Sequence, residues 1–202
     1  MVQPLNVLKE SPSQTAGPYV HIGCTPNFCG IGGVYPEDLG ARMKTGPVQG
    51  EEIVITGAVH DGMGMALKDA LVEIWQADAQ GRFAGHDAEA DPNFSGFGRS
   101  PGDMDTGAFR FETVKPGRVR WPDGRLQAPH VSVWIVARGI NIGLQTRIYF
   151  SDEAEANAED PILTRLEHQS RVRTLIAARQ DDGSYRFDVH IQGLQETVFF
   201  DI

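Results

Sequence analysis

Short β-forming runs separated by turn signals fill the chain from about residue 52 onward, and this pattern constrains the fold most strongly. Tyr185–Gln192 alternates apolar with polar residues, which is the period of a strand with one buried face. His130–Arg138 is nearly all apolar, which predicts a central strand buried on both faces. Further strands are expected at Glu52–Val59, Leu71–Ala77, Ala108–Thr113, Thr146–Phe150, Val172–Ala178 and Thr197–Ile202. The sequence thus predicts an all-β fold of short mixed strands with long irregular loops, a β-sandwich or a partial barrel.

Residues 1–50 differ from the rest and are predicted to form an irregular N-terminal arm. Pro and Gly recur through this segment, and it shows neither the period of a strand nor that of a helix. Its apolar residues, such as Tyr19, Ile22 and Phe28, should pack on the domain that follows or on a neighbouring chain. We therefore divide the sequence into this arm and a β-sandwich domain, residues 51–202.

One or two short helices are expected within the second part. Asp152 with Glu155 resembles a capping box before an alanine-rich turn, which should end ahead of Pro161. A second helical turn is expected at Ile162–His168. Within the arm, Pro36–Met43 has a weaker helical tendency.

Charge and hydropathy exclude several classes of function. The 18 basic and 27 acidic residues give a net charge of −9, which argues against a nucleic-acid partner. No apolar stretch is long enough for a membrane span, and the first residues do not resemble a secretion signal, so a cytoplasmic location is expected. Cys24 and Cys29 are too few for a disulfide scaffold. With His21 they could supply three soft metal ligands, but a loop with two free thiols is favoured.

Two residues on the apolar strand are candidates for a site. His130 opens the strand and could be a metal ligand, although a core histidine bonded to a backbone carbonyl is favoured. Arg138 follows the strand end, where its guanidinium could bind a carboxylate ligand or form an internal ion pair. The sequence leaves these two roles of Arg138 open. The acidic loop with Asp87, Glu89 and Asp91 could be an acid–base set, but a solvated loop is favoured.

Eight segments together carry a resemblance to a known family. They are SQTAGPYVHIG (Ser13–Gly23), VEIWQADAQGRF (Val72–Phe83), DPNFSGFGR (Asp91–Arg99), TVKPG (Thr113–Gly117), APHVSV (Ala128–Val133), ARGIN (Ala137–Asn141), TRIYFSDEAEAN (Thr146–Asn157) and ETVFFDI (Glu196–Ile202). The combination resembles the intradiol ring-cleavage dioxygenases and covers nearly the whole chain, about Ser11 to Ile202. The resemblance implies a β-sandwich, in agreement with the strand pattern.

The resemblance also implies an iron centre that this sequence does not keep. Catalytic chains of the family hold one ferric ion with two Tyr and two His, whose phenolates suit Fe(III). The matching positions here are His86, Val119, His130 and Ser132, and Gln127 stands where the family has an Arg. The resemblance therefore implies that this chain binds no metal and corresponds to the alpha chains of the family, which accompany an iron-bearing beta chain.

The alpha arm of such heteromers forms part of the wall of the beta chain's active site. The residues matching that role are Thr15, Gly17, Pro18, Tyr19 and Arg138. The implied reaction, in the beta-ketoadipate pathway of aromatic catabolism, cleaves protocatechuate with O2 to 3-carboxy-cis,cis-muconate, and the implied assembly is a higher-order alpha–beta oligomer. Two alternatives remain: a self-sufficient dioxygenase with an altered metal shell that includes His86 and His130, and a metal-free β-sandwich assembly module.

Overall fold

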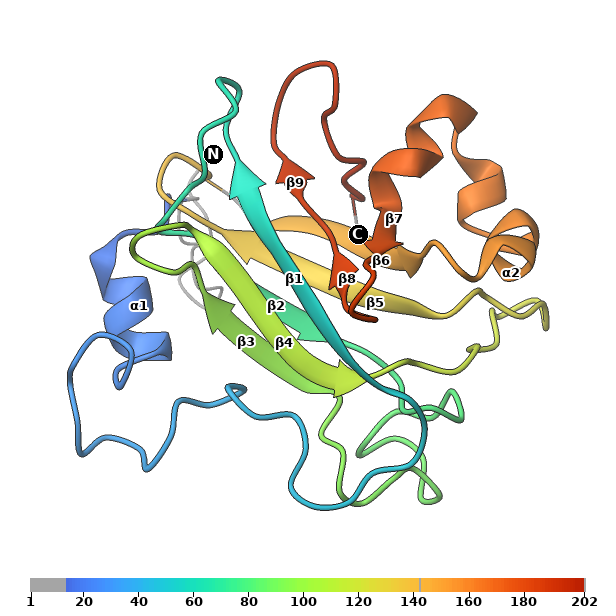
Figure 1. Ribbon diagram of the computed structural model, residues 1–202, viewed down its shortest axis with the longest axis horizontal. Helices are drawn as coiled ribbons and strands as arrows, with labels where there is room; N and C mark the ends of the chain where they lie inside the picture. The colour runs from blue at the N-terminus through green and yellow to red at the C-terminus, as the bar shows by residue number, and fades with distance from the viewer. Residues whose placement is uncertain (1–13, 142, 202) are drawn as a thin grey trace, which may run out of the picture.

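The computed structural model describes residues 14–141 and 143–201 and is built mainly from strands (Figure 1). The strands are β1 (Glu52–His60), β2 (Leu71–Trp75), β3 (Phe97–Pro101), β4 (Ala108–Val114), β5 (His130–Val136), β6 (Leu144–Phe150), β7 (Ile176–Arg179), β8 (Tyr185–Arg186) and β9 (Val189–His190). The helices are α1 (Pro18–Cys24) and α2 (Ala154–Glu159), with 3-10 turns η1 (Leu163–Arg165) and η2 (Gln169–Leu175). The predicted all-β class with short helices is confirmed.

The strands form one mixed sheet in the order β3-β2-β5-β6-β7-β8-β1-β4, with β9 also paired to β1. Most pairs are antiparallel, whereas β6–β7, β1–β8 and β1–β9 are parallel. The sheet curls so far that its two terminal strands, β3 and β4, lie side by side (Figure 1). The result is a nearly closed, flattened sheet in which β5 lies between β2 and β6.

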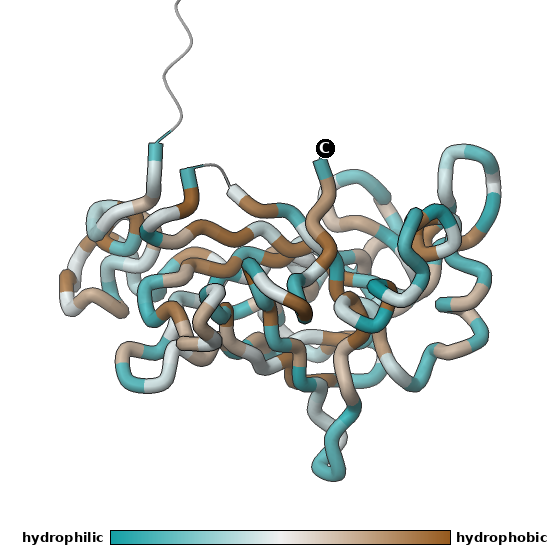
Figure 2. The backbone as a smooth tube through the Cα atoms, turned by 90° about the horizontal axis from the view of Figure 1, so that it is seen from above, coloured by the Kyte–Doolittle hydropathy of each residue, from teal (hydrophilic) through white to brown (hydrophobic). Residues whose placement is uncertain are grey.

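The core lies inside the curled sheet. Phe109 and Phe111 of β4 pack with the apolar residues of β5, and Val131 and Ile135 are fully buried there. In β4 the two phenylalanines alternate with the exposed Arg110 and Glu112, so one face of the strand points inward. The prediction that β5 is buried on both faces was wrong, because Ser132, Trp134 and Val136 on its other face are only partly buried. A smaller cluster under α2 and the 3-10 turns contains Tyr149, Leu163 and Leu175. Figure 2 shows the brown apolar segments in the middle of the molecule and teal polar loops at its rim.

The predicted strand over Tyr185–Gln192 is interrupted. It forms β8 and β9, which both pair with β1 but on either side of Gly57. The Phe187 carbonyl oxygen lies against Gly57, and Asp188 Oδ1 accepts a hydrogen bond from the Ala58 amide at 3.0 Å. A side chain therefore takes a place in the ladder that a backbone carbonyl would fill in a regular strand.

Two other strand predictions were wrong in part. Val172–Ala178 was expected as a strand, but η2 occupies it through Leu175 and β7 begins only at Ile176. The tail at Thr197–Asp201 forms no strand. Its backbone is held by isolated hydrogen bonds, such as that from Phe200 N to Gln145 O at 2.8 Å. Ile202 lies outside the described residues. Strand β3 was not predicted at all.

The predicted capping box at Asp152 and Glu155 was wrong. Helix α2 begins at Ala154 without a side-chain cap. Asp152 Oδ2 instead accepts hydrogen bonds from Lys115 Nζ at 2.9 Å and Tyr185 Oη at 2.8 Å, and it pairs with Arg179 at 3.0 Å. Its carboxylate therefore joins β7, β8 and the residue that follows β4 rather than starting a helix.

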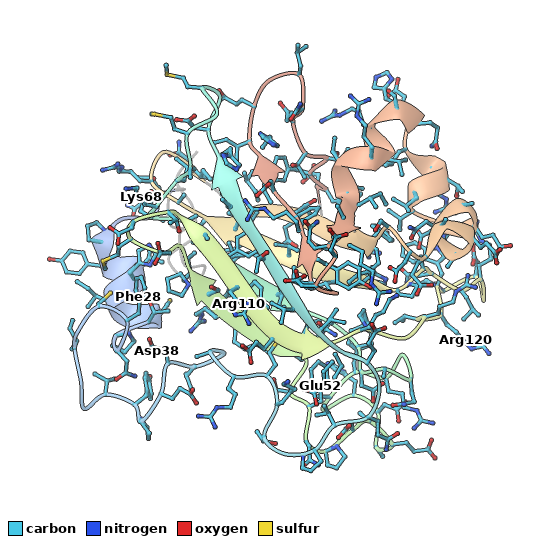
Figure 3. The ribbon with its side chains drawn as sticks, in the orientation of Figure 1. Phe28, Asp38, Glu52, Lys68, Arg110 and Arg120 are labelled. Carbon is cyan, nitrogen blue, oxygen red and sulfur yellow. The ribbon has the colours of Figure 1, made fainter. Side chains whose placement is uncertain are left out.

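The described part of the arm is irregular except for α1, which the sequence did not predict. Pro18 begins this helix, where its missing N–H costs nothing. Pro36–Met43 forms bends rather than a helix. The Asp38 carboxylate accepts the backbone amides of Asn27 and Phe28, which folds the arm back on itself (Figure 3). Met43 enters the main core, so the end of the arm packs on the sheet. The division at residue 50 stays a prediction.

Among the described residues, no helix combines the length and the apolar character that crossing a membrane requires. The cytoplasmic location stays a prediction.

Candidate functional site

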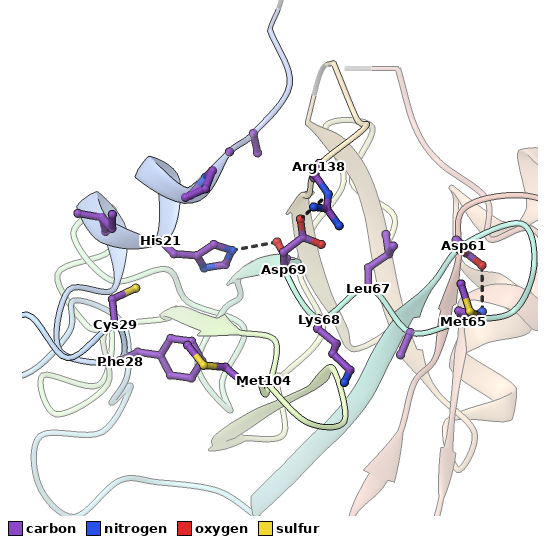
Figure 4. A pocket seen from close by; sticks show the side chains of 15 residues that line it. His21, Phe28, Cys29, Asp61, Met65, Leu67, Lys68, Asp69, Met104 and Arg138 are labelled. Atoms are coloured by element: carbon purple, nitrogen blue, oxygen red, sulfur yellow. Dashed lines mark hydrogen bonds and ion pairs between the residues drawn. The ribbon is translucent and has the colours of Figure 1, made fainter.

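A cleft of about 860 Å³ lies between α1, the connection from β1 to β2, and the end of β5 (Figure 4). Apolar side chains such as Phe28, Met65 and Met104 line much of it, and Lys68 and Arg138 bring positive charge. An apolar hollow with a few charged groups is the usual form of a site for a small organic molecule. The cleft is therefore the candidate site.

Arg138 stands at the wall of the cleft, two residues after the end of β5. Its side chain is 82% exposed, and its Nε lies 3.6 Å from Asp69 Oδ2. Of the two roles that the sequence left open for Arg138, the ion pair is observed, whereas binding of a carboxylate ligand in the cleft stays a prediction. Only a small part of its guanidinium is taken up by that ion pair.

The arm contributes another part of the wall. Gly17 and Pro18 line the cleft at the start of α1. Thr15 Oγ1 accepts a hydrogen bond from the Gly139 amide at 2.8 Å, which places the arm beside Arg138. Tyr19 is 84% exposed and is not among the residues that line the cleft. The structure thus brings four of the five predicted residues together and leaves Tyr19 projecting from α1.

Two further contributors to this site are Asp69, which the sequence did not single out, and His21, which it singled out only as a possible metal ligand. His21 Nε2 donates a hydrogen bond to the backbone carbonyl of Asp69 at 2.9 Å (Figure 4). Asp69 follows the exposed Lys68 in a turn ahead of β2. Acidic residues are common in such turns, so the sequence gives no reason to select it. The only sequence signal was that Leu67–Asp69 lies just before a strand whose end carries motif residues.

The residues considered as soft metal ligands do not gather. Cys24 and Cys29 are free thiols, and His21 is engaged with Asp69. In the part of the chain that the structure describes, no group of three His, Cys, Asp or Glu side chains is placed to hold a metal ion. The acidic loop is structural too, because Asp91 accepts backbone amides of Gln49 and Asn93.

The positions that match the family's metal ligands lie at the other end of β5. His130 is buried there, and its Nδ1 lies 2.8 Å from the Ala128 carbonyl, which is the core-histidine role that the sequence favoured. Arg147 donates a hydrogen bond to Gln127 Oε1 at 2.8 Å, and on β6 it stands opposite Ser132. A guanidinium therefore occupies the neighbourhood of these positions.

The remaining two positions offer no metal donor in this region. The Val119 carbonyl accepts the Gln127 amide at 2.8 Å, and its aliphatic side chain has no atom that could bind a metal. His86 is exposed in a turn closed by its own amide to the Phe83 carbonyl at 3.1 Å.

Burial lowers the pKa of His130 to about 4, and the nearby positive charge of Arg147 adds to this effect. The imidazole is therefore neutral in the folded chain at neutral pH. In the unfolded chain it takes up a proton near its ordinary pKa of 6.5. Between these two values the unfolded state binds more protons, so stability falls as the pH falls.

Replacing His130 with glutamine is expected to weaken this pH dependence. Between about pH 7 and about pH 4.5, the loss in free energy of unfolding should be smaller than in the unmodified chain by about 2 kcal/mol. Denaturant unfolding at the two pH values measures the difference. The exposed His168, changed to glutamine, is the matched control and should keep the original dependence. Equal losses in all three proteins would contradict the prediction.

The comparisons with known proteins agree with one another. The chain matches the model of the family described as Dioxygenase over residues 25–193. It is 46% identical to the protocatechuate 3,4-dioxygenase alpha chain of Pseudomonas putida, over 98% of this chain and 99% of that one. It is also 34% identical to the protocatechuate 3,4-dioxygenase beta chain of Burkholderia cepacia, over 80% of this chain and 76% of that one.

Solved structures give the same fold at lower identity. The catechol 1,2-dioxygenase from Pseudomonas arvilla C-1 superimposes with a TM-score of 0.59 at 24% identity, and the match covers 77% of this chain. This chain spans 56% of the length of that structure.

Proposed function

This chain belongs to the intradiol ring-cleavage dioxygenases, and we propose that it acts as the alpha subunit of a protocatechuate 3,4-dioxygenase. It is part of an enzyme in this proposal, with a beta chain as its partner. The assembled enzyme adds both atoms of O2 to protocatechuate and opens the ring between the two hydroxylated carbons, giving 3-carboxy-cis,cis-muconate. The 46% identity to the alpha chain of Pseudomonas putida, over nearly the full length of both chains, supports the proposal.

One observation carries the division of labour between the chains. The cleft with Arg138 lies beyond the last residue of β5, whereas His130 is the first residue of that strand. Eight residues of extended chain span roughly 25 Å. Arg138 and the arm therefore lie too far away to act on a molecule at this chain's own metal-ligand positions. Arg138 and the arm therefore act at a site on another chain.

The residues at those positions do not fit the ferric ion of the family. Val119 has no donor atom in its side chain, and the His86 side chain is exposed. The guanidinium of Arg147 next to His130 repels a cation. We therefore place the iron on the beta chain, where it supplies the chemistry that prepares the substrate for O2.

The surface around the cleft has the character of a covered face. Large apolar side chains project there, with Tyr19 84% and Met63 85% exposed, and Met65 and Met104 beside them. Exposed apolar patches of this kind mark interaction sites. We assign this face, with Thr15, Gly17, Pro18, Tyr19 and Arg138, to the wall of the beta chain's active site.

Within that site Arg138 binds the substrate's carboxylate. The whole chain carries a charge of −9, so an anionic substrate gains nothing from its long-range field. Attraction must be local, and a guanidinium can hold a carboxylate through two parallel hydrogen bonds. Such a contact in a partly wet site contributes about 1.5 kcal/mol. The backbone at Gly17 allows close approach to the aromatic ring.

Ring cleavage is expected only when both chains are present. The chain is purified alone and together with its beta partner, and each preparation is assayed for bound iron and for protocatechuate cleavage. Iron and full activity should appear in the complex, and neither should appear in this chain alone. The beta chain alone is the control that shows what the alpha subunit adds. Iron with ring cleavage in the isolated chain would support the self-sufficient alternative instead.

A further inference from the structure

Asp69 contacts both parts of the cleft wall at once. Its carboxylate lies 3.6 Å from Arg138 Nε, and its backbone carbonyl accepts the hydrogen bond from His21 Nε2 at 2.9 Å. His21 belongs to α1 in the arm, whereas Arg138 follows β5. One residue of the β1–β2 connection therefore joins two segments that are more than a hundred positions apart in sequence. Figure 4 shows both contacts.

The position of Asp69 determines which side of the guanidinium stays free. A guanidinium can meet a carboxylate through Nε and one terminal nitrogen, or end-on through its two terminal nitrogens. The contact of Asp69 is with Nε, which blocks the first arrangement. The end-on pair is left for another carboxylate.

Arg138 also needs to be held. Its side chain is 82% exposed, and a long side chain in water loses rotamer freedom when it binds a ligand. An ion pair that already restricts the side chain reduces this loss on binding. The adjacent Gly139 is fixed as well, because its backbone amide donates a hydrogen bond to Thr15 Oγ1 at 2.8 Å. Thr15, Gly139, Arg138, Asp69 and His21 thus form a closed circuit of contacts.

We propose that Asp69 is a positioning residue, which aims the end-on face of Arg138 toward the carboxylate of an aromatic substrate. Through His21 it also ties the arm to the same point. The proposal rests on the proposed function, because it assumes that Arg138 meets the substrate. It adds a residue that acts through Arg138 and does not touch the substrate.

Charge and positioning predict opposite effects at this residue. A carboxylate near the site repels an anionic substrate, so removal of its charge alone would tighten binding. If Asp69 aims Arg138, removal of the charge must weaken binding in spite of that gain. The direction of the change in KM therefore separates the two effects.

The test uses the assembled alpha–beta enzyme carrying D69N. KM for protocatechuate is expected to rise by about threefold to tenfold with kcat nearly unchanged. The inhibition constant of catechol, which lacks the carboxylate, should not change. D69E keeps the charge and should restore much of the affinity. The matched control is D123N, which breaks an exposed Asp–Arg ion pair outside the cleft, that of Asp123 Oδ2 with Arg125 at 2.7 Å, and KM should not rise.

R138A distinguishes failure of this inference from failure of the proposed function. If R138A raises KM but D69N leaves it unchanged or lowers it, the positioning role is overturned and the role of Arg138 stands. If R138A leaves KM unchanged, the assignment of Arg138 itself fails. In the R138A background, D69N should bring no further rise, and an additional rise of equal size would overturn the inference.

Discussion

Replacing Gly57 with alanine is expected to destabilise the chain by about 3 kcal/mol, with a fall in Tm of about 9 °C. A methyl group at this position would overlap the Phe187 carbonyl oxygen and would come within 2.6 Å of Phe109 Cζ. The Phe187 carbonyl belongs to the backbone, and the Phe187 amide donates a hydrogen bond to Thr56 O at 2.8 Å. Moving this carbonyl aside would therefore cost the hydrogen bond. Strand β1 would have to separate from β8 and β9.

Gly32 is the matched control for this substitution. A Cβ added there meets nothing within 4 Å, and the residue is exposed in the arm. The same glycine-to-alanine change should therefore alter Tm by about 1 °C or less. Thermal unfolding of the assembled enzyme, followed by circular dichroism, measures both variants. A Gly57 variant as stable as the Gly32 variant would show that the split between β8 and β9 has another cause.

Removal of the Asp160 carboxylate should have the largest effect of any single polar substitution. Asp160 is fully buried, and its Oδ1 accepts the amides of Ile162 at 2.8 Å and Leu163 at 2.9 Å. Its Oδ2 accepts the Ala128 amide at 2.8 Å, and Tyr149 Oη lies 3.3 Å from Oδ1. Change to alanine leaves these donors buried without an acceptor. The expected loss is about 4 kcal/mol.

The comparison variant for Asp160 is an alanine at Asp182. That carboxylate also accepts a backbone amide, from Ser184 at 2.9 Å, but it is exposed, and water can replace it. Its loss should cost about 1 kcal/mol or less. Urea unfolding measures the loss in free energy of unfolding for each variant. The loss should be several-fold larger for the Asp160 variant than for the Asp182 variant. Similar small losses would mean that water reaches the groups around Asp160.

How much of the fold was predictable depends on where each strand lies. β4 and β5 have clear apolar patterns, because one face of each is buried by the sheet itself. β3 has the sequence Phe-Gly-Arg-Ser-Pro, in which apolar and polar residues do not alternate. The Arg99 amide donates a hydrogen bond to the Gly40 carbonyl of the arm at 2.8 Å. Its pairing depends on β2 and on the arm, and local sequence does not contain that information. The break at Phe187 likewise depends on Gly57, more than a hundred residues away.

The candidate site was predictable in part for the same reason. Arg138 could be singled out because it follows a long apolar strand, and strand ends often carry functional groups. Asp69 could not, because its importance comes from the two segments that meet it in space. The Asp152 capping box failed because Lys115, Arg179 and Tyr185 compete for the same carboxylate. Local patterns could not reveal partners that the fold brings from a distance.

The closure of the sheet has a consequence for how this chain can associate. An open sheet can recruit a neighbour by pairing backbone to backbone along its outermost strand. Here β3 and β4 turn toward each other, and residues 40–44 run along β3. These two ends of the sheet are therefore poorly suited to recruit another strand, and side chains on loops and on α1 are the surface left for contacts with a partner. Recognition between such chains is then free to diverge in sequence, residue by residue, while the strands that carry the fold stay as they are.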